Sequence, residues 1–225
     1  MKTLAIHAIA ALLLASSCHD RRAADQHTFT EGMKEYLARR GDLCVGKSSW
    51  PIDVTPADFA GHSRDAVQMP VLERLGLVHG EDTVTELRTE EGPVKREVRR
   101  YELTPAGQRY YLVRDGGPRS TSNAAPRRDL CVAKLSLDAV IGWDAPSDGA
   151  PLSHTVVQYT YHVDAAPWTS DPDVTRTFPM VARVLQGAGR DRLTEAFTLT
   201  KKGWVADDLL GKPGSSSEIA RAEGK

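Results

Sequence analysis

The chain carries one short sequence twice, each time with a cysteine at its third position. Residues 42–47 read Asp-Leu-Cys-Val-Gly-Lys, and residues 129–134 read Asp-Leu-Cys-Val-Ala-Lys. A second pair of similar segments follows in the same order, at 101–107 and 197–203. Two matches in one order predict an internal duplication of an α+β unit. The alternative is coincidence, because a threonine that caps a helix after an apolar strand is common.

Hydrophobic spacing predicts both helices and antiparallel strands. Phe29, Met33, Tyr36 and Leu37 fall on one face of a helix. Residues 156–163 are rich in β-branched and aromatic side chains, as is typical of a strand. Other helices are expected at 64–76, 104–111 and 178–185, and other strands at 43–45, 84–87, 94–103, 130–143 and 193–199. The expected fold class is therefore α+β, with antiparallel strands and short helices in two related lobes.

Composition indicates where the lobes begin and end. Of the 225 residues, 40% are hydrophobic, which is enough for a core but leaves part of the chain as linker or tail. Residues 114–128 are rich in glycine, serine and proline, so we expect a linker there. This places a first lobe at 28–113 and a second at 129–210. A polar tail at 211–225 is expected to be disordered.

The first residues have the pattern of an export signal. Lys2 precedes an apolar stretch at 4–14 that is too short to span a bilayer, and small residues then lead to Cys18. This pattern resembles the lipobox of bacterial prolipoproteins, in which the cysteine receives a diacylglycerol and becomes the new amino terminus. The resemblance implies a signal peptide at 1–17, a lipid on Cys18 and a tether at 18–27. The alternative is an ordinary secretory signal cleaved nearby, with Cys18 a plain thiol.

The lipobox resemblance also implies a subcellular location and a pairing of the other two cysteines. His19, and not aspartate, follows Cys18, which in enteric-type sorting implies transfer to the outer membrane, facing the periplasm. Taken whole, the chain is similar to lipoproteins of Gram-negative bacteria, a resemblance that implies no particular activity. Lipidation of Cys18 leaves Cys44 and Cys131, both in the repeated hexapeptide, as a pair in an oxidising compartment. We therefore expect a disulfide between them; the alternative is two buried thiols.

Residues 64–111 carry a second local pattern. A helix that ends at Gly76 is followed by a charged hairpin and then by Tyr-Glu-Leu-Thr-Pro at 101–105. This order resembles the recognition helix and wing of winged-helix transcription regulators. The resemblance implies the local fold alone, because the export signal and the net charge of −1 argue against binding of nucleic acid.

No motif in the sequence points to catalysis. The seven histidines lack the spacing of metal ligands. Ser63 follows His62, but Asp65 stands where a nucleophile elbow requires glycine. We therefore expect no enzyme, no metal and no cofactor. Trp50 and Trp168 each adjoin a proline and are candidates to line a ligand groove, although packing at strand ends is the commoner role of such side chains.

These observations predict a non-enzymatic envelope lipoprotein. It would associate with the membrane through its lipid and bind another envelope protein, as a structural factor, an inhibitor or an immunity protein. The alternative is a lipoprotein that binds a small hydrophobic or sugar ligand in a groove between the lobes. A large exposed apolar patch would favour the first function, and a closed aromatic pocket would favour the second.

Overall fold

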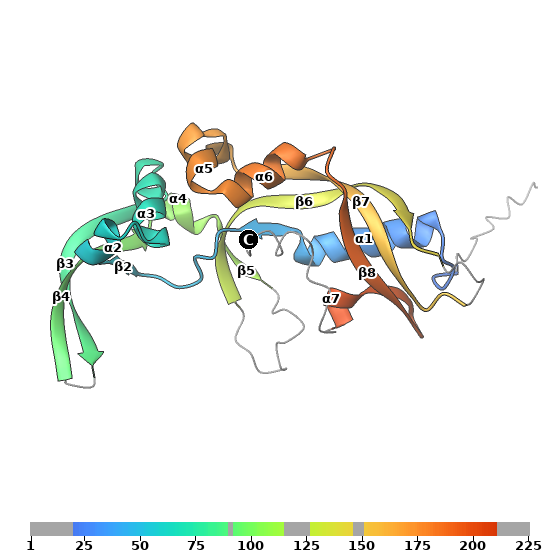
Figure 1. The fold of residues 1–225 in the computed structure, drawn as a ribbon, viewed down its shortest axis with the longest axis horizontal. Helices are drawn as coiled ribbons and strands as arrows, with labels where there is room; N and C mark the ends of the chain where they lie inside the picture. Colours follow the sequence, from blue (N-terminus) through green and yellow to red (C-terminus); the bar gives the residue numbers. More distant parts are fainter. Residues whose placement is uncertain (1–19, 90–91, 115–126, 146–150, 211–225) are drawn as a thin grey trace, which may run out of the picture.

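The fold combines helices with antiparallel sheets and is α+β, as expected. The computed structural model describes residues 20–89, 92–114, 127–145 and 151–210. The expected signal peptide at 1–17, the lipidation site Cys18, the expected tail at 211–225 and most of the expected linker lie outside these ranges. Figure 1 shows an elongated molecule, with a larger sheet at one end and a smaller sheet at the other. Within the described ranges, no helix is long and apolar enough to cross a membrane.

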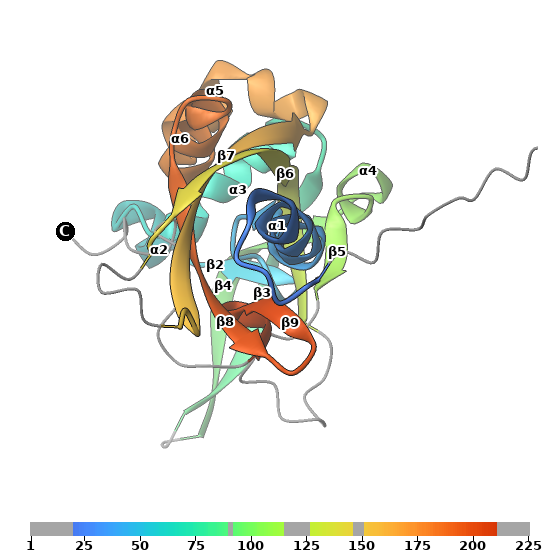
Figure 2. The same ribbon diagram turned by 90° about the vertical axis from the view of Figure 1, so that its right-hand side faces the viewer.

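The larger sheet has six strands in the described part of the chain. Its order is β1-β6-β7-β8-β9, with β5 also paired to β6, and every pairing is antiparallel. The strands are β1 (Asp42–Cys44), β5 (Tyr111–Arg114), β6 (Arg127–Trp143), β7 (His154–Ala165), β8 (Leu193–Thr200) and β9 (Gly203–Ala206). Figure 2 shows that this sheet curls around helix α1 (Gln26–Arg40).

Helix α1 fills the curve of the larger sheet. Asp25 caps its start by accepting a hydrogen bond from the backbone N–H of Thr28 at 2.8 Å. The side chains that helical spacing places on one face are all buried: Phe29, Met33, Tyr36 and Leu37. Phe29 also contacts three aromatic rings, with centroids 4.9 to 5.8 Å away: Trp143, Trp204 and Phe197. The helix and the curved sheet therefore share an aromatic core.

Three short helices follow β7 in the chain. They lie on the side of the larger sheet away from α1 (Figures 1 and 2). They are the 3-10 helix η1 (Pro167–Ser170), α5 (Pro172–Thr177) and α6 (Pro179–Gly187). Val174 of α5, Val181 of α6 and Phe178 between these two helices are buried. Helix α7 (Asp207–Leu210) follows β9 and ends the described chain.

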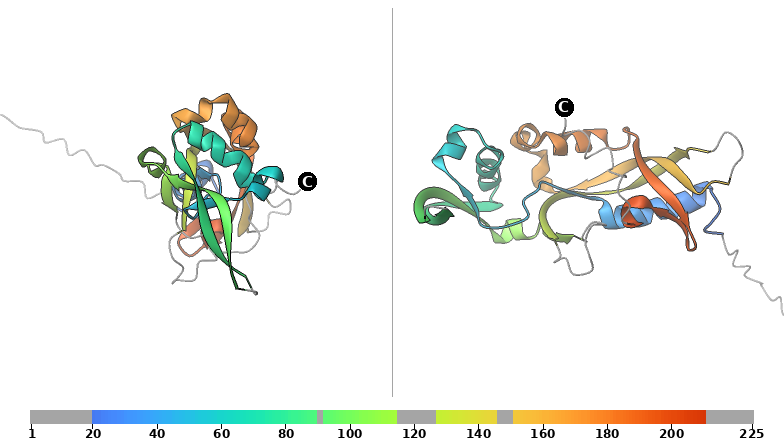
Figure 3. Two further views of the ribbon diagram at one scale, coloured as in Figure 1. Left: turned by 90° about the vertical axis from the view of Figure 1, so that its left-hand side faces the viewer. Right: turned by 60° about the horizontal axis from the view of Figure 1, so that its bottom comes forward.

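The smaller sheet has the strand order β2-β4-β3. Its strands are β2 (Ile52–Val54), β3 (Val78–Thr89) and β4 (Gly92–Leu103), and its helices are α2 (Pro56–Ala60), α3 (Arg64–Arg74) and α4 (Pro105–Gln108). Helix α3 is followed by Gly76 with a φ of 73°, and Thr104 caps α4. A helix, a glycine turn, a hairpin and a capped helix thus follow one another in the order expected for 64–111. Figure 3 shows how far this hairpin projects from the rest of the molecule.

The two copies of the repeated hexapeptide lie against each other, antiparallel, at the junction of β1 and β6. Lys134 of the second copy forms an ion pair with Asp42 of the first at 3.0 Å. Asp129 of the second copy accepts a hydrogen bond from the backbone N–H of Lys47 at 2.8 Å. Each copy therefore places its aspartate against the lysine of the other.

The expected duplication into two lobes is not confirmed. Residues 101–107 pass from β4 into α4, whereas residues 197–203 pass from β8 through a turn into β9. Helix α1 and strand β1 belong to the expected first lobe, 28–113, yet they pack with strands of the expected second lobe, 129–210. The larger sheet joins both halves of the chain because β1 pairs with the edge of β6 that β7 does not occupy.

An ion-pair cluster connects the two ends of the molecule. Arg74, at the end of α3, contacts Asp171 and Asp173 at the start of α5, with N–O distances of 2.7 Å to each. Both carboxylates lie at the amino-terminal end of α5, where the helix dipole also favours negative charge. The smaller sheet is thus held to the helices that cover the larger one.

Candidate functional site

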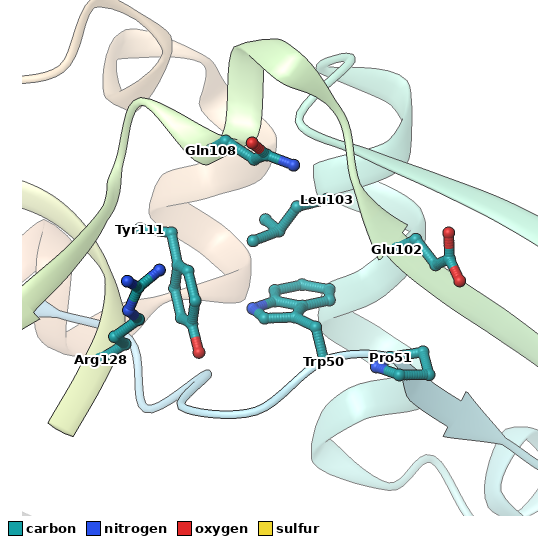
Figure 4. Close-up of a pocket in the computed structure, with 7 residues that line it drawn as sticks. All are labelled: Trp50, Pro51, Glu102, Leu103, Gln108, Tyr111 and Arg128. Carbon is teal, nitrogen blue, oxygen red and sulfur yellow. The ribbon is translucent and has the colours of Figure 1, made fainter. Parts of the chain in front are cut away.

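A cavity of about 410 Å³ lies where the smaller sheet approaches β5. Its lining comes from the loop before β2, the end of β4, helix α4 and the starts of β5 and β6. The lining residues, shown in Figure 4, are Trp50, Pro51, Glu102, Leu103, Gln108, Tyr111 and Arg128. Trp50, a candidate from the sequence, is therefore part of a cavity built from segments far apart in the chain. We call it the Trp50 cavity.

Two aromatic rings, Trp50 and Tyr111, meet at right angles in the Trp50 cavity, with centroids 6.5 Å apart. The Tyr111 hydroxyl donates a hydrogen bond to the carbonyl of Ser48 at 2.6 Å. The Arg128 guanidinium lies over the same ring, 5.9 Å from its centroid. These contacts hold the Tyr111 ring at its hydroxyl and at one face. The indole Nε1 of Trp50 is buried and has no hydrogen-bond partner among the described residues.

Trp168, the other tryptophan expected in a groove, does not line the Trp50 cavity. It lies in η1, and its ring packs edge-on against Tyr110, with centroids 5.8 Å apart. Its indole Nε1 is also buried without a partner in the described part of the chain. The structure therefore does not bring Trp50 and Trp168 together in one groove, because each tryptophan packs against a different one of two consecutive tyrosines.

A second hollow, a groove of about 640 Å³, lies on the smaller sheet beside α2. Its lining residues are Val54, Pro56, Phe59, Asp82, Thr83, Val84, Glu97, Val98 and Arg99. Phe59 is 37% exposed and Val84 is 58% exposed, so both offer apolar surface to solvent. Sequence reasoning did not find this groove, since Phe59 in α2 and Val84 in β3 share a surface only once the hairpin is folded. We call it the α2 groove.

Next to the α2 groove, part of one edge of strand β4 is not paired with any described strand. Strand β3 pairs with β4 along its whole length, but β2 pairs only with residues 99–101 of β4. Among the described strands, none pairs with residues 93–98 on the β2 side. The outward backbone groups of such an edge can form hydrogen bonds with an extended chain.

Cys44 and Cys131 form a disulfide in the larger sheet. They are partners in the antiparallel pairing of β1 with β6, and their Cα atoms are 3.8 Å apart. The bond joins positions separated by 87 residues. It therefore ties the first half of the chain to the second.

Glu195 in β8 is a buried carboxylate, only 2% exposed. Burial is the main cause that raises the pKa of Glu195 to about 7; the nearby Tyr36 hydroxyl and the backbone N–H of Asp208 oppose it, and the negative charges of Asp208 and Asp207 act in the same direction as burial. No hydrogen bond of ordinary geometry reaches either carboxylate oxygen from the described residues. Glu195 lines neither the Trp50 cavity nor the α2 groove, so we treat it as part of the core.

Neither a search for metal-binding residues nor comparison with known proteins indicates a function. The described residues include no group of three or more His, Cys, Asp or Glu side chains placed to hold a metal ion. Comparison with protein-family models, with curated proteins and with solved structures finds no match to this chain. We base the proposed function on the Trp50 cavity and the α2 groove.

Proposed function

We propose that this chain is a non-enzymatic lipoprotein, held at the outer membrane by a lipid on Cys18, that binds another envelope protein. The lipobox-like sequence before Cys18 supports the anchor, and the disulfide of Cys44 with Cys131 is consistent with an oxidising compartment. The observation that carries the proposal is the α2 groove, where Phe59 and Val84 are exposed beside the part of the β4 edge that no described strand pairs with.

An extended segment of a partner protein would fit this surface. Along β4 residues 93–98, its backbone would supply the hydrogen bonds that β2 supplies only to residues 99–101. Alternate side chains of an extended segment point to one face, so they would enter the groove and cover Phe59 and Val84. Covering apolar surface favours binding by about 25 cal/mol per Å² before the costs of association are subtracted.

Site-specific crosslinking in intact cells tests this function. A photoreactive residue at Val84 is expected to give one discrete crosslinked protein, and the substitution Phe59→Asp should abolish that product. Ile141 is the matched control, because it is also an exposed apolar strand residue, at 44%, but belongs to the larger sheet. No product at Val84, or the same product at Ile141, would contradict the proposal.

A second candidate function is the binding of a small ligand in the Trp50 cavity. The observation that favours it is the pair of rings at right angles, Trp50 and Tyr111, in a cavity whose volume of about 410 Å³ lies in the usual range of ligand sites. This function and the first use different surfaces, so one does not exclude the other. Titration of the mature chain with small ligands, followed at the Trp50 indole, tests it.

A further inference from the structure

We propose that the Trp50 cavity binds a neutral saccharide. This inference rests on the second candidate function and names the class of its ligand. Three properties of the cavity support it: an aromatic surface held in place, a rim with side chains of both charges, and exposed polar groups on that rim without a hydrogen-bond partner among the described residues.

Trp50 and Tyr111 form the aromatic surface of the cavity. Trp50 is partly buried, and Tyr111 is held by its hydrogen bond to Ser48 and by Arg128 over its ring. A sugar ring has one face made largely of C–H groups, which packs on an indole ring as other apolar groups do. Because the surface is already held in place, little side-chain freedom is lost when a ring packs on it.

The rim of the cavity carries charges of both signs. In Figure 4, Glu102 and Arg128 lie on opposite sides of Trp50, with the Tyr111 ring between Trp50 and Arg128 and with Gln108 near Leu103. A simple anion would be attracted to Arg128 but repelled by Glu102, and a simple cation would meet the reverse. A neutral ligand avoids both conflicts, and a fatty chain would gain nothing from these polar groups, which it cannot hydrogen-bond.

The polar groups of the rim are available. Glu102 and Gln108 are exposed, and neither side chain has a hydrogen bond or salt bridge to another described residue, although the charge of Glu102 acts on nearby Arg100. Carboxylate oxygens only accept, guanidinium groups only donate, and an amide does both. Sugar hydroxyls donate and accept, so a polyhydroxylated ligand can form hydrogen bonds with side chains of each of these three kinds.

Trp168 provides an internal comparison. It also packs edge-on against a tyrosine, Tyr110, and its Nε1 is also buried without a partner among the described residues. It does not, however, line the Trp50 cavity. Two tryptophans in similar aromatic pairs therefore differ in whether a ligand in this cavity can reach them.

The experiment is an NMR titration of the mature chain, labelled with ¹⁵N, in a detergent without a sugar headgroup. The probes are maltotriose, the trisaccharide of N-acetylglucosamine, and laurate. The substitutions Trp50→Phe and Trp168→Phe assign the two indole N–H signals. We expect one or both saccharides to shift the Trp50 signal, to leave the Trp168 signal in place, and to bind about tenfold more weakly to the Gln108→Ala and Glu102→Gln variants.

The other outcomes separate this inference from the function on which it rests. A Trp50 shift with laurate and none with either saccharide would overturn the saccharide class and leave the small-ligand function standing. No shift with any probe would overturn both. Equal shifts of the Trp50 and Trp168 signals would overturn the location of the site.

Discussion

Cys44 on β1 and Cys131 on β6 lie directly opposite each other and are joined by a disulfide. The bond closes a loop of 87 positions, and closing such a loop is worth on the order of 4 kcal/mol in the chain-entropy model. We therefore expect reduction to lower the free energy of unfolding by up to about that amount. Urea unfolding with and without a reductant measures the difference.

The double variant Cys44→Ala, Cys131→Ala is the control for this prediction. It should have the stability of the reduced protein, and reductant should not change it further. Identical unfolding midpoints for the oxidised and reduced protein would contradict the prediction. So would the labelling of both thiols in unfolded protein that was never reduced.

The second prediction concerns the pH dependence that Glu195 confers. Its pKa is about 7 in the folded protein, against about 4.3 for glutamate in an unfolded chain. The folded state binds this proton more tightly than the unfolded state does. The contribution of Glu195 to the free energy of unfolding is therefore greatest below about pH 4.3, and it is lost as the pH rises from there through about 7. Glu195→Gln should therefore gain on the order of 3 kcal/mol relative to the natural protein between pH 4 and pH 8.

Urea unfolding at several pH values measures this relative gain. The control is Glu86→Gln, at an exposed position of β3, whose stability curve should run parallel to that of the natural protein. A Glu195→Gln curve that is also parallel over this range would refute the prediction.

The third prediction contrasts two phenylalanines. Phe29 is fully buried among Trp143, Trp204 and Phe197, so Phe29→Ala should lower the free energy of unfolding by about 3 to 5 kcal/mol. Phe59, half-exposed in the α2 groove, should cost far less when changed to alanine, and that variant should lose partner binding instead. Thermal unfolding distinguishes the two, and equal losses of stability would show that the core is misassigned.

The fourth prediction concerns the contact of α4 with the start of the hairpin. A Cβ atom at Gly107 would overlap the backbone carbonyl of Leu77, and backbone gives way less easily than a flexible side chain. Gly107→Ala should therefore destabilise the protein by about 1 to 3 kcal/mol. Gly142 in β6 is the control, because nothing lies within 4 Å of a Cβ atom built there. If the Gly107→Ala substitution left the free energy of unfolding unchanged, α4 would not pack closely on Leu77.

The features that could be predicted from the sequence depend on local chemistry. Helix α1 could be predicted because four apolar side chains recur at helical spacing, and the start of α4 because Thr104 and Pro105 form a typical helix start. The long strand β7 could be predicted from its β-branched and aromatic residues. Each of these signals lies inside the element that it predicts or directly at its start.

The features that could not be predicted depend on contacts between distant segments. The repeated hexapeptide suggested two separate lobes, whereas its two copies pair inside one sheet. Trp50 and Trp168 both adjoin a proline, and only the positions of Tyr111 and Tyr110 separate their roles. The α2 groove has no local signal, because it depends on how far β2 extends along β4.

The amino terminus of the mature protein tests the central claim, that this chain is a lipid-anchored envelope protein. Cleavage before Cys18 leaves Cys-His-Asp-Arg, residues 18–21, as the first tryptic peptide. In mass spectrometry of protein purified from its native membrane, we predict that this peptide carries a diacylglycerol on the sulfur of Cys18. A mature chain that begins, unmodified, at any other residue would contradict the claim.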